Sequence, residues 1–197
     1  MAKLVFGMMQ SLDGYVAGAS QTFAATTAGA GSPILPPPGE LLHTHFNDYI
    51  RGSAGMIYGR RMYEIMRYWD EDHPQFDAVE RDFAVAWRSK PKWVASRTLK
   101  SVGPNATLIR DNVGAFVRDL KAKINGVIDV AGPELAGSLT TLGLIDEYRL
   151  YLRPYVLGAG KPFFFGPRPP LHFVGVESIG GEAVRVTYRS TQLAKTP

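Results

Sequence analysis

The fold is decided by the stretch Gly126–Phe164, GVIDVAGPELAGSLTTLGLIDEYRLYLRPYVLGAGKPFF. Its first apolar run, Val127–Ala131, predicts a short strand. Gly132-Pro133 then breaks the strand and favours a helix start, because proline suits the first helical position. Gly143 ends the predicted helix, and Asp146–Val156 is the next expected strand. This stretch therefore predicts a strand, a glycine turn, a helix and a second strand.

The turn at Gly132-Pro133 also predicts a binding property. The first backbone N–H groups of a helix have no partner inside the helix, and this end carries a partial positive charge. Such an end attracts phosphate groups. We therefore expect an anion site here that suits a nucleotide.

Composition limits the classes of protein. The chain has 197 residues, of which 45% are hydrophobic, so one domain with one sizeable core is expected. The formal charge of +4, with no run of five or more basic residues, fits an anionic small ligand better than nucleic acid. Without cysteine, disulfides and thiolate metal sites are excluded. No window approaches the roughly 20 apolar residues of a membrane helix, and the start lacks a signal-peptide pattern, so a soluble, cytoplasmic protein is expected.

The remaining elements alternate between strand and helix. This order predicts an α/β three-layer sandwich, with a mainly parallel central sheet and helices on both faces. Period-two alternation on either side of Gly180-Gly181 adds a C-terminal antiparallel hairpin. Residues Ala19–Gly39 form a long loop expected to shape the substrate pocket. The expected helices are Glu40–Arg51, Arg60–Met66, Asp77–Trp87 and Val113–Ile124, and the other strands are Lys3–Met9, Gly55–Tyr58, Lys92–Ser96, Thr107–Arg110, Leu171–Ile179 and Ala183–Leu193.

Three of the predicted strands end in small or polar turns, at Gly59-Arg60-Arg61, Ser96-Arg97-Thr98 and Ala131-Gly132-Pro133. Ligands of open α/β sheets bind beyond the carboxyl ends of the strands. If the three turns lie along one edge, they form a single nucleotide site.

Six short motifs are spread over nearly the whole chain: SLDGYVAG (Ser11–Gly18), YGRRMYE (Tyr58–Glu64), VASRTL (Val94–Leu99), VAGPEL (Val130–Leu135), GLIDEYRL (Gly143–Leu150) and LGAGKPFF (Leu157–Phe164). In this order they resemble the dihydrofolate reductase-like superfamily, and in particular the branch of the C-terminal reductase domain of bacterial riboflavin biosynthesis. The resemblance implies NADPH as cofactor, reduction of a carbon–nitrogen double bond in a pterin or a flavin precursor, and pairing as a homodimer.

Carried over by position, the resemblance places the cofactor phosphates near the Gly59 turn and the adenosine ribose near Ser96 and Arg97. An arginine there suits a 2′-phosphate and favours NADPH over NADH. The nicotinamide would border Val16 and Ala17 through backbone amides. The full set implied for the cofactor is Val16, Ala17, Gly59, Arg60, Arg61, Ser96, Arg97, Ala131, Gly132, Pro133, Glu134 and Leu135.

Two residues depart from the family's pattern. Ala131 replaces the usual first glycine and adds a methyl group where the backbone is expected to meet the cofactor. Met62 stands where threonine is common, which removes one hydroxyl donor to phosphate. Both departures favour weaker cofactor binding.

Reduction of an imine also needs a proton, and two carboxyl groups are candidates to relay it. A carboxyl group in an apolar pocket has a raised pKa and can hold that proton near neutral pH. Glu40 opens the helix after the proline loop, and Asp13 lies in the turn after the first strand. The alternatives are that Glu40 is an acid favoured by the helix dipole and that Asp13 only caps its turn.

Aromatic residues after the second helix suggest a wall for a flat heterocycle, with Tyr63 and Trp69 as its substrate-binding members. The alternative is ordinary core packing. His43 and His45 lie two residues apart, and this spacing does not suit a helical metal site, so no metal is expected.

Two classes of function therefore stand. One is an NADPH-dependent reductase acting on a small, planar, nitrogen-containing substrate. The other is a binding or sensing protein on the same scaffold without turnover, because fold does not determine function. Nucleic-acid binding is weakly supported, since the basic residues are dispersed.

Overall fold

The computed structural model describes residues 1–18 and 37–191. Most of the loop expected to shape the substrate pocket, Ala19–Gly39, lies outside the described residues. The helices are α1 (Glu40–Gly52), α2 (Arg60–Met66), the 3-10 turn η1 (Arg67–Asp70), α3 (Ala78–Ser89), α4 (Val113–Lys123) and α5 (Pro133–Thr141). The strands are β1 (Lys3–Gln10), β2 (Tyr15–Gly18), β3 (Gly55–Gly59), β4 (Lys92–Ala95), β5 (Ala106–Ile109), β6 (Val127–Ala131), β7 (Glu147–Leu152), β8 (Gly160–Pro162), β9 (Leu171–Ile179) and β10 (Ala183–Ser190).

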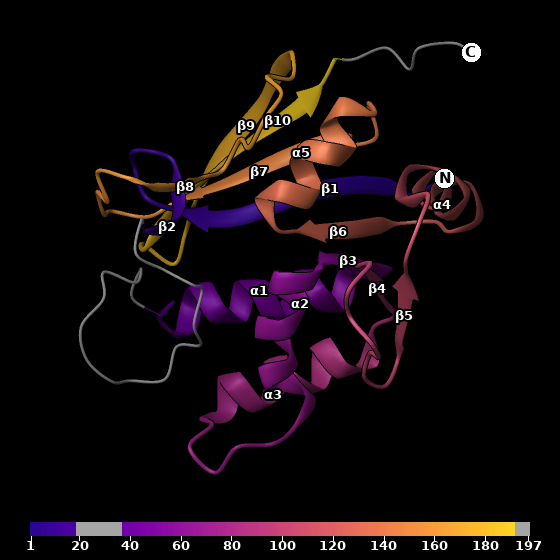
Figure 1. Cartoon of the computed structure of the whole chain (residues 1–197). Coiled ribbons are helices and arrows are strands. Elements are labelled where there is room, and N and C mark those ends of the chain that lie inside the picture. The colour runs from indigo at the N-terminus through magenta and orange to yellow at the C-terminus, as the bar shows by residue number, and fades with distance from the viewer. Residues whose placement is uncertain (19–36, 192–197) are drawn as a thin grey trace.

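The main sheet has the order β5-β4-β3-β6-β1-β7-β10-β9. Neighbouring strands from β5 to β7 are parallel, whereas β10 pairs antiparallel with both β7 and β9. The predicted α/β sandwich, with a mainly parallel sheet and a C-terminal hairpin, is confirmed. In Figure 1 the hairpin β9–β10 continues the sheet beyond β7, at the side of the molecule away from α3.

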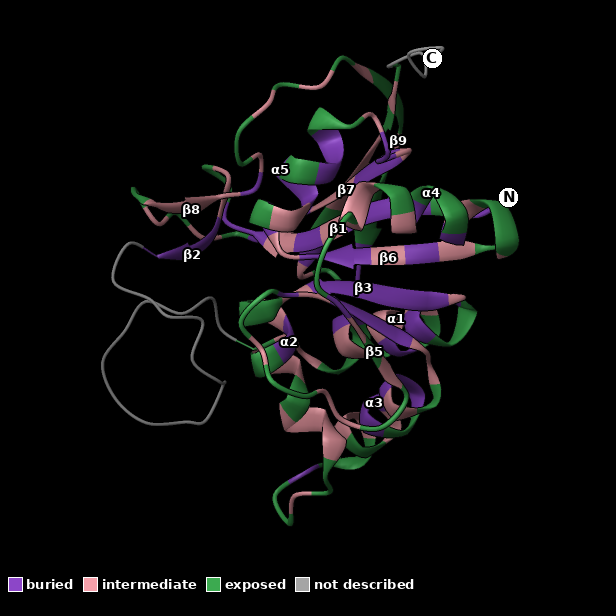
Figure 2. Ribbon diagram, turned by 45° about the vertical axis from the view of Figure 1, so that its right-hand side comes forward, coloured by how far each residue is buried: buried purple, intermediate pink, exposed green. Residues whose placement is uncertain are grey.

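Apolar side chains fill both faces of the sheet. On one face, Phe6 and Val130 pack with Val117 of α4 and Leu139 of α5. On the other face, Tyr58 packs with residues of α1, α2 and α3, including the fully buried Trp87. Figure 2 shows the central strands β1, β3 and β6 largely buried between these layers. This burial from both sides explains why the central strands are continuous apolar runs.

Local signals account for the helix starts. Asp77 accepts a hydrogen bond from the amide of Glu80, whose carboxylate in turn accepts one from the amide of Asp77, so α3 begins with a capping box. The start of α5 is the predicted one, with Pro133 in its first turn. Gly132 before it has φ of 107°, a backbone conformation that favours glycine.

The sequence patterns missed one small sheet. β2 pairs antiparallel with β8, and at Gly160 an added Cβ would lie 1.9 Å from the carbonyl oxygen of Ala17, so only glycine fits. The strand expected over Asp146–Val156 is also shorter than predicted. It ends at Leu152, because the chain turns at Arg153, whose carbonyl accepts a hydrogen bond from the amide of Tyr155.

Candidate functional site

The three glycine- and arginine-containing turns lie side by side. β3 is hydrogen-bonded to β4 on one side and to β6 on the other, and all three run parallel. Their carboxyl ends, Gly59, Ala95 and Ala131, therefore meet along one edge of the sheet. We call the residues that follow these strand ends, 59–61, 96–98 and 131–135, the cofactor edge.

Exposed arginines cross the cofactor edge. Arg60 donates to the hydroxyl of Thr98 at 2.9 Å and to the carboxylate of Glu64 at 2.9 Å, and so links the start of α2 to the turn after β4. Arg97 is 83% exposed and lies 3.6 Å from Asp111. The side chain of the neighbouring Ser96 instead accepts the amides of residues 98 and 99 and holds that turn. The guanidinium groups are thus available at the surface, and the serine shapes the backbone.

Glu134, in the first turn of α5, holds two cations. Its carboxylate accepts a hydrogen bond from Lys161 of β8 and lies 3.4 Å from Arg61 of α2. The hydrogen bond from Lys161, followed by the charges of Lys161 and Arg61, lowers the pKa of Glu134. The carboxylate therefore stays ionised at neutral pH and joins three elements at the cofactor edge.

The two departures from the family's pattern turn inward. Ala131 is 6% exposed and belongs to the core between the sheet and α1–α3. Met62 is partly buried and packs against the core on both faces of the sheet. The methyl group of Ala131 therefore fills core space, and the contact of its backbone with a cofactor stays a prediction.

Four other residues of the predicted cofactor set also pack inward. Pro133 is buried, and Leu135 packs against the core beneath α5. The side chains of Val16 and Ala17 in β2 are buried as well. At these positions only the backbone is available to a ligand.

The ends of β1 and β7 form the other half of this edge of the sheet. Gln10 at the end of β1 and Ser11 after it are buried, and Arg153 after β7 is 2% exposed. We call the residues 10–17, 39–40 and 153 the substrate edge, because the two predicted acids, Asp13 and Glu40, both belong to it.

Asp13 does not match a buried acid. Its carboxylate accepts hydrogen bonds from the amides of Leu157 and Gly158 at 3.1 and 2.7 Å. Its pKa is lowered, first by the hydrogen bond with Ser11 and then by these two amides. The expectation that desolvation raises the pKa of Asp13 is wrong, because the group is exposed and every hydrogen bond stabilises its ionised form.

Glu40 lies exposed in the first turn of α1. Gly39, the residue before it, is fixed by a contact with a distant part of the chain. Its amide donates a hydrogen bond of 2.8 Å to the carboxylate of Glu182. The buried Arg153 lies 3.4 Å from the same carboxylate. The tip of the β9–β10 hairpin therefore determines where α1 begins.

The predicted aromatic wall is wrong for Tyr63. Its side chain is 1% exposed, and its hydroxyl accepts the amide of Gly103 at 2.7 Å. Trp69 is half-buried in an aromatic cluster, with ring centroids 5.1 Å from Phe76 and 4.7 Å from Phe83. Tyr63 is oriented inward because α2 covers the edge of the core, so its ring belongs to the core packing that was the alternative.

Sequence reasoning missed several polar partners at these edges. Thr98 and Lys161 lie within motifs that resemble the family, and only the fold shows that they contact Arg60 and Glu134. Glu182 carries no sequence signal of its own, because its partners Gly39 and Arg153 are far away along the chain.

A second polar group lies between α1 and the sheet, away from both edges. Tyr49 of α1 donates to Asp129 of β6 at 2.8 Å, and the guanidinium of Arg149 lies 5.1 Å from the centre of the Tyr49 ring. Desolvation raises the pKa of Asp129 to about 7, although the bond from Tyr49 and the charge of Arg149 oppose the shift. Next to them, Nε2 of His45 lies 3.1 Å from the hydroxyl oxygen of the buried Tyr151. All three side chains are half-buried, and we call Tyr49, Asp129 and Arg149 the half-buried polar cluster.

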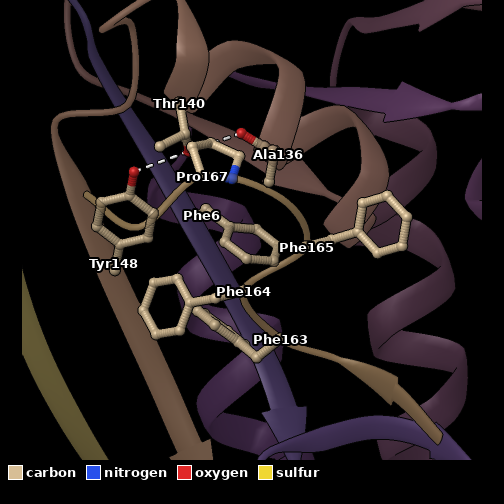
Figure 3. Close-up of a pocket in the computed structure, with 9 residues that line it drawn as sticks. Phe6, Ala136, Thr140, Tyr148, Phe163, Phe164, Phe165 and Pro167 are labelled. Atoms are coloured by element: carbon tan, nitrogen blue, oxygen red, sulfur yellow. Dashed lines mark hydrogen bonds between the residues drawn. The ribbon is translucent and has the colours of Figure 1, made fainter.

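A small pocket lies between α5 and the sheet, where Phe163–Phe165 pass beneath the helix (Figure 3). Its volume is about 10 Å³, which is room for about one water molecule. Beside this pocket, the hydroxyl groups of Thr140 and Tyr148 form a hydrogen bond of 2.8 Å. This pocket is too small for a heterocycle, so it is not a substrate site.

The described part of the chain contains no group of three or more residues that could hold a metal ion. Over the same residues, no helix has the length and hydropathy to cross a membrane.

Residues 2–184 match the family of the RibD C-terminal domain. The chain belongs to this family. The uncharacterized protein YyaP of Bacillus subtilis is 30% identical over 148 residues, which cover 73% of this chain and 77% of YyaP.

Solved structures show the same fold as this RibD C-terminal domain. A putative riboflavin biosynthesis protein from Shewanella sp. PV-4 superposes with a TM-score of 0.68 at 22% identity, over 98% of this chain and 100% of its own. The deaminase/5-amino-6-(5-phosphoribosylamino)uracil reductase of Thermotoga maritima superposes with a TM-score of 0.62 at 15% identity, over 96% of this chain and 56% of its own. This chain thus spans little more than half of the Thermotoga protein.

Proposed function

We propose that this protein is an NADPH-dependent reductase that transfers a hydride to the C=N bond of a small heterocycle resembling a pterin or a flavin precursor. The observation that carries the proposal is the adjacency of three parallel strand ends, each followed by a turn that presents backbone amides or a guanidinium group. Membership of the RibD C-terminal domain family supports it.

The residues at the cofactor edge fit a dinucleotide. The backbone at Gly132 leads into the first turn of α5, where free amides and the helix dipole favour a pyrophosphate. Arg60 and Arg61 stand opposite, at the start of α2. The methyl group of Ala131 does not obstruct this region, because it is buried in the core, and Met62 is partly buried against the same core.

Arg97 is the proposed determinant of NADPH over NADH. Its guanidinium is exposed beside the turn after β4, with one exposed carboxylate, Asp111, as its ion-pair partner. A surface pair of this kind is weak and is readily exchanged for a phosphate with two negative charges.

When bound, NADPH supplies the hydride, and the protein orients the reactants and delivers a proton. We propose Glu40 for the proton relay. Its place at the start of α1 is set by the bond between Gly39 and Glu182. Asp13 is the second candidate, because its carboxylate is already occupied by hydrogen bonds from the amides of Leu157 and Gly158.

For the substrate class, the support comes from a relative. The Thermotoga protein is named as a reductase of an aminated uracil, a planar nitrogen heterocycle. We propose a substrate of that chemical type for this chain.

Titration with NADPH and NADH, followed by nucleotide fluorescence, tests the proposal. We expect NADPH to bind in the micromolar range and NADH more weakly. Arg97→Gln should reduce the preference for NADPH about tenfold, as expected for loss of one charged hydrogen-bonding partner. The matched control is Arg118→Gln, an exposed arginine on α4. If neither nucleotide binds below millimolar concentration, the reductase proposal is lost.

Turnover separates the reductase from the binding protein on the same scaffold. Oxidation of NADPH in the presence of a panel of pterins, aminated uracils and flavin precursors supports the reductase. Tight binding of NADPH without oxidation across that panel favours the non-catalytic alternative.

We also propose that the protein forms a homodimer. Four large apolar side chains of the terminal hairpin, Phe173, Val174, Val176 and Val184, are exposed. Several large apolar side chains exposed on one hairpin favour a protein–protein contact. Light scattering coupled to size-exclusion chromatography should give twice the chain mass, and Val176→Asp should give the monomer. A wild-type monomer at micromolar concentration contradicts this proposal.

A further inference from the structure

Glu134 occupies an unusual position for a carboxylate. It lies at the cofactor edge, where the proposed function requires positive charge, and it pairs with Arg61 and Lys161. These two cations come from α2 and β8, on either side of the first turn of α5. We propose that Glu134 is a built-in counter-anion that holds Arg61 and Lys161 until a nucleotide phosphate replaces it.

The ion pairs of Glu134 with Arg61 and Lys161 are exposed enough for a phosphate to replace the carboxylate. The side chains of Arg61, Glu134 and Lys161 are 79%, 50% and 30% exposed. Ion pairs this exposed contribute little to the stability of a fold, because solvent screens them and ordering long side chains costs entropy. A diphosphate carries more charge than one carboxylate and accepts more hydrogen bonds, so it competes well for the same cations.

The positions of the Glu134 carboxylate and its two cations predict how a phosphate replaces the carboxylate. The lowered pKa of Glu134 keeps its carboxylate charged over the pH range in which the protein would work. Its negative charge repels an incoming phosphate until the side chain rotates away. Once displaced, it leaves Arg61 and Lys161 ordered next to the amides of the α5 start. Glu134 is thus a positioning residue, which acts on the ligand through the two cations.

This inference rests on the proposed function, because that function supplies the phosphate. It predicts a change in anion affinity on loss of Glu134 that is opposite in sign to the change expected if Glu134 has only a structural role. If Glu134 only ties α2, α5 and β8 together, its loss loosens the site and weakens anion binding. If it is a counter-anion, loss of its charge strengthens anion binding.

The experiment compares the wild-type protein with Glu134→Gln by calorimetric titration, at low ionic strength, with inorganic pyrophosphate and with NADPH. Glutamine keeps the hydrogen-bond acceptor and removes the charge. We expect both ligands to bind about threefold to tenfold more tightly, as estimated from removing one unit charge a few ångströms from a phosphate in water. This gain should shrink as salt is added.

The matched control is Asp119→Asn, which removes the same charge from an exposed ion pair with Lys123 on α4. It should leave both affinities unchanged. Lys161→Gln should weaken pyrophosphate binding, and Glu134→Gln should gain less in that background, since one of the two freed cations is then missing. Thermal unfolding of each variant shows that the comparison is made on folded protein.

The outcomes distinguish a failure of this inference from a failure of the proposed function. Tighter pyrophosphate binding by Glu134→Gln, with no binding of NADPH to either protein, supports the counter-anion and refutes the reductase. NADPH binding that is unchanged or weaker in Glu134→Gln supports the reductase and overturns the counter-anion. If neither ligand binds to either protein, both proposals fail.

Discussion

The charges at the cofactor edge and those of the half-buried polar cluster are held in opposite ways. At the cofactor edge, Arg60, Arg61 and Arg97 are exposed and each pairs with an exposed or half-exposed carboxylate. Beneath α1, Asp129 is withdrawn from water and has Tyr49 as its hydrogen-bond donor. Exposed pairs contribute little to folding and are easily exchanged, whereas buried polar groups are costly to leave unpaired. The first region is therefore suited to a charged ligand, and the second serves the fold.

The largest expected effect concerns the half-buried polar cluster. The pKa of Asp129 is about 7 in the folded protein against 3.8 for the ordinary group, so the folded state binds the proton more tightly than the unfolded state. The stabilisation from this proton is complete below the ordinary pKa and is lost as the pH rises through about 7. Asp129→Asn stays neutral and keeps an acceptor for Tyr49, so it should be more stable than wild type at pH 8, by on the order of 1–3 kcal/mol.

Chemical denaturation at several pH values measures this difference. The advantage of Asp129→Asn should grow between about pH 4 and pH 7 and then level off. Asp119→Asn, on the surface of α4, should show no such dependence. A constant difference over that pH range would show that Asp129 does not take up its proton on folding.

The next effect concerns the cofactor edge. Arg60→Gln removes a guanidinium that spans from α2 to Thr98, and we expect NADPH to bind about tenfold more weakly. The melting temperature should change by no more than about 2 °C, since an exposed pair is lost. Arg118→Gln is the control for charge. If Arg60→Gln lost much stability and kept its NADPH affinity, Arg60 would serve the fold and not the ligand, contrary to the role given to the cofactor edge.

Tyr63 gives a sharper test of which aromatic residues belong to the fold. Tyr63→Phe leaves the amide of Gly103 without its acceptor, which should cost about 1–2 kcal/mol of stability and leave NADPH affinity unchanged. Tyr68→Phe removes a hydroxyl whose partner is the exposed Gln75 and should change neither quantity. If Tyr63→Phe raised the KM of a substrate without changing stability, the original prediction of a substrate wall would be restored.

The smallest effect is expected at Asp13. Its lowered pKa means that the ionised form stabilises the fold above the ordinary pKa of 3.8, and that this contribution is lost as the pH falls through the lower, folded value. Asp13→Asn should slightly lower the melting temperature at pH 7, and the difference should vanish in acid. Turnover should be almost unchanged, whereas Glu40→Gln should lower kcat and alter its pH profile. Loss of turnover in Asp13→Asn with full turnover in Glu40→Gln would exchange the two roles.

Much of the fold follows from local patterns in the sequence. Val127–Ala131, Leu171–Ile179 and the helix Arg60–Met66 have the predicted bounds, because apolar periodicity and glycine or proline breaks act over a few residues. Whether the three strand ends share one edge was left conditional by the sequence, and the strand order β4-β3-β6 decided it, since neighbouring parallel strands place their carboxyl ends together.

The sequence by itself thus determined the fold class, the family and the edge at which a ligand is expected, because these depend on short-range patterns and their order. Tertiary structure alone decided the burial, the orientation and the partners of each side chain. The pairing of β2 with β8, the inward orientation of Tyr63, the exposed turn that lowers the pKa of Asp13 and the contact of Glu134 with Lys161 all join distant parts of the chain or depend on them. Burial and electrostatics depend on what surrounds a group in space, and no local pattern contains that information.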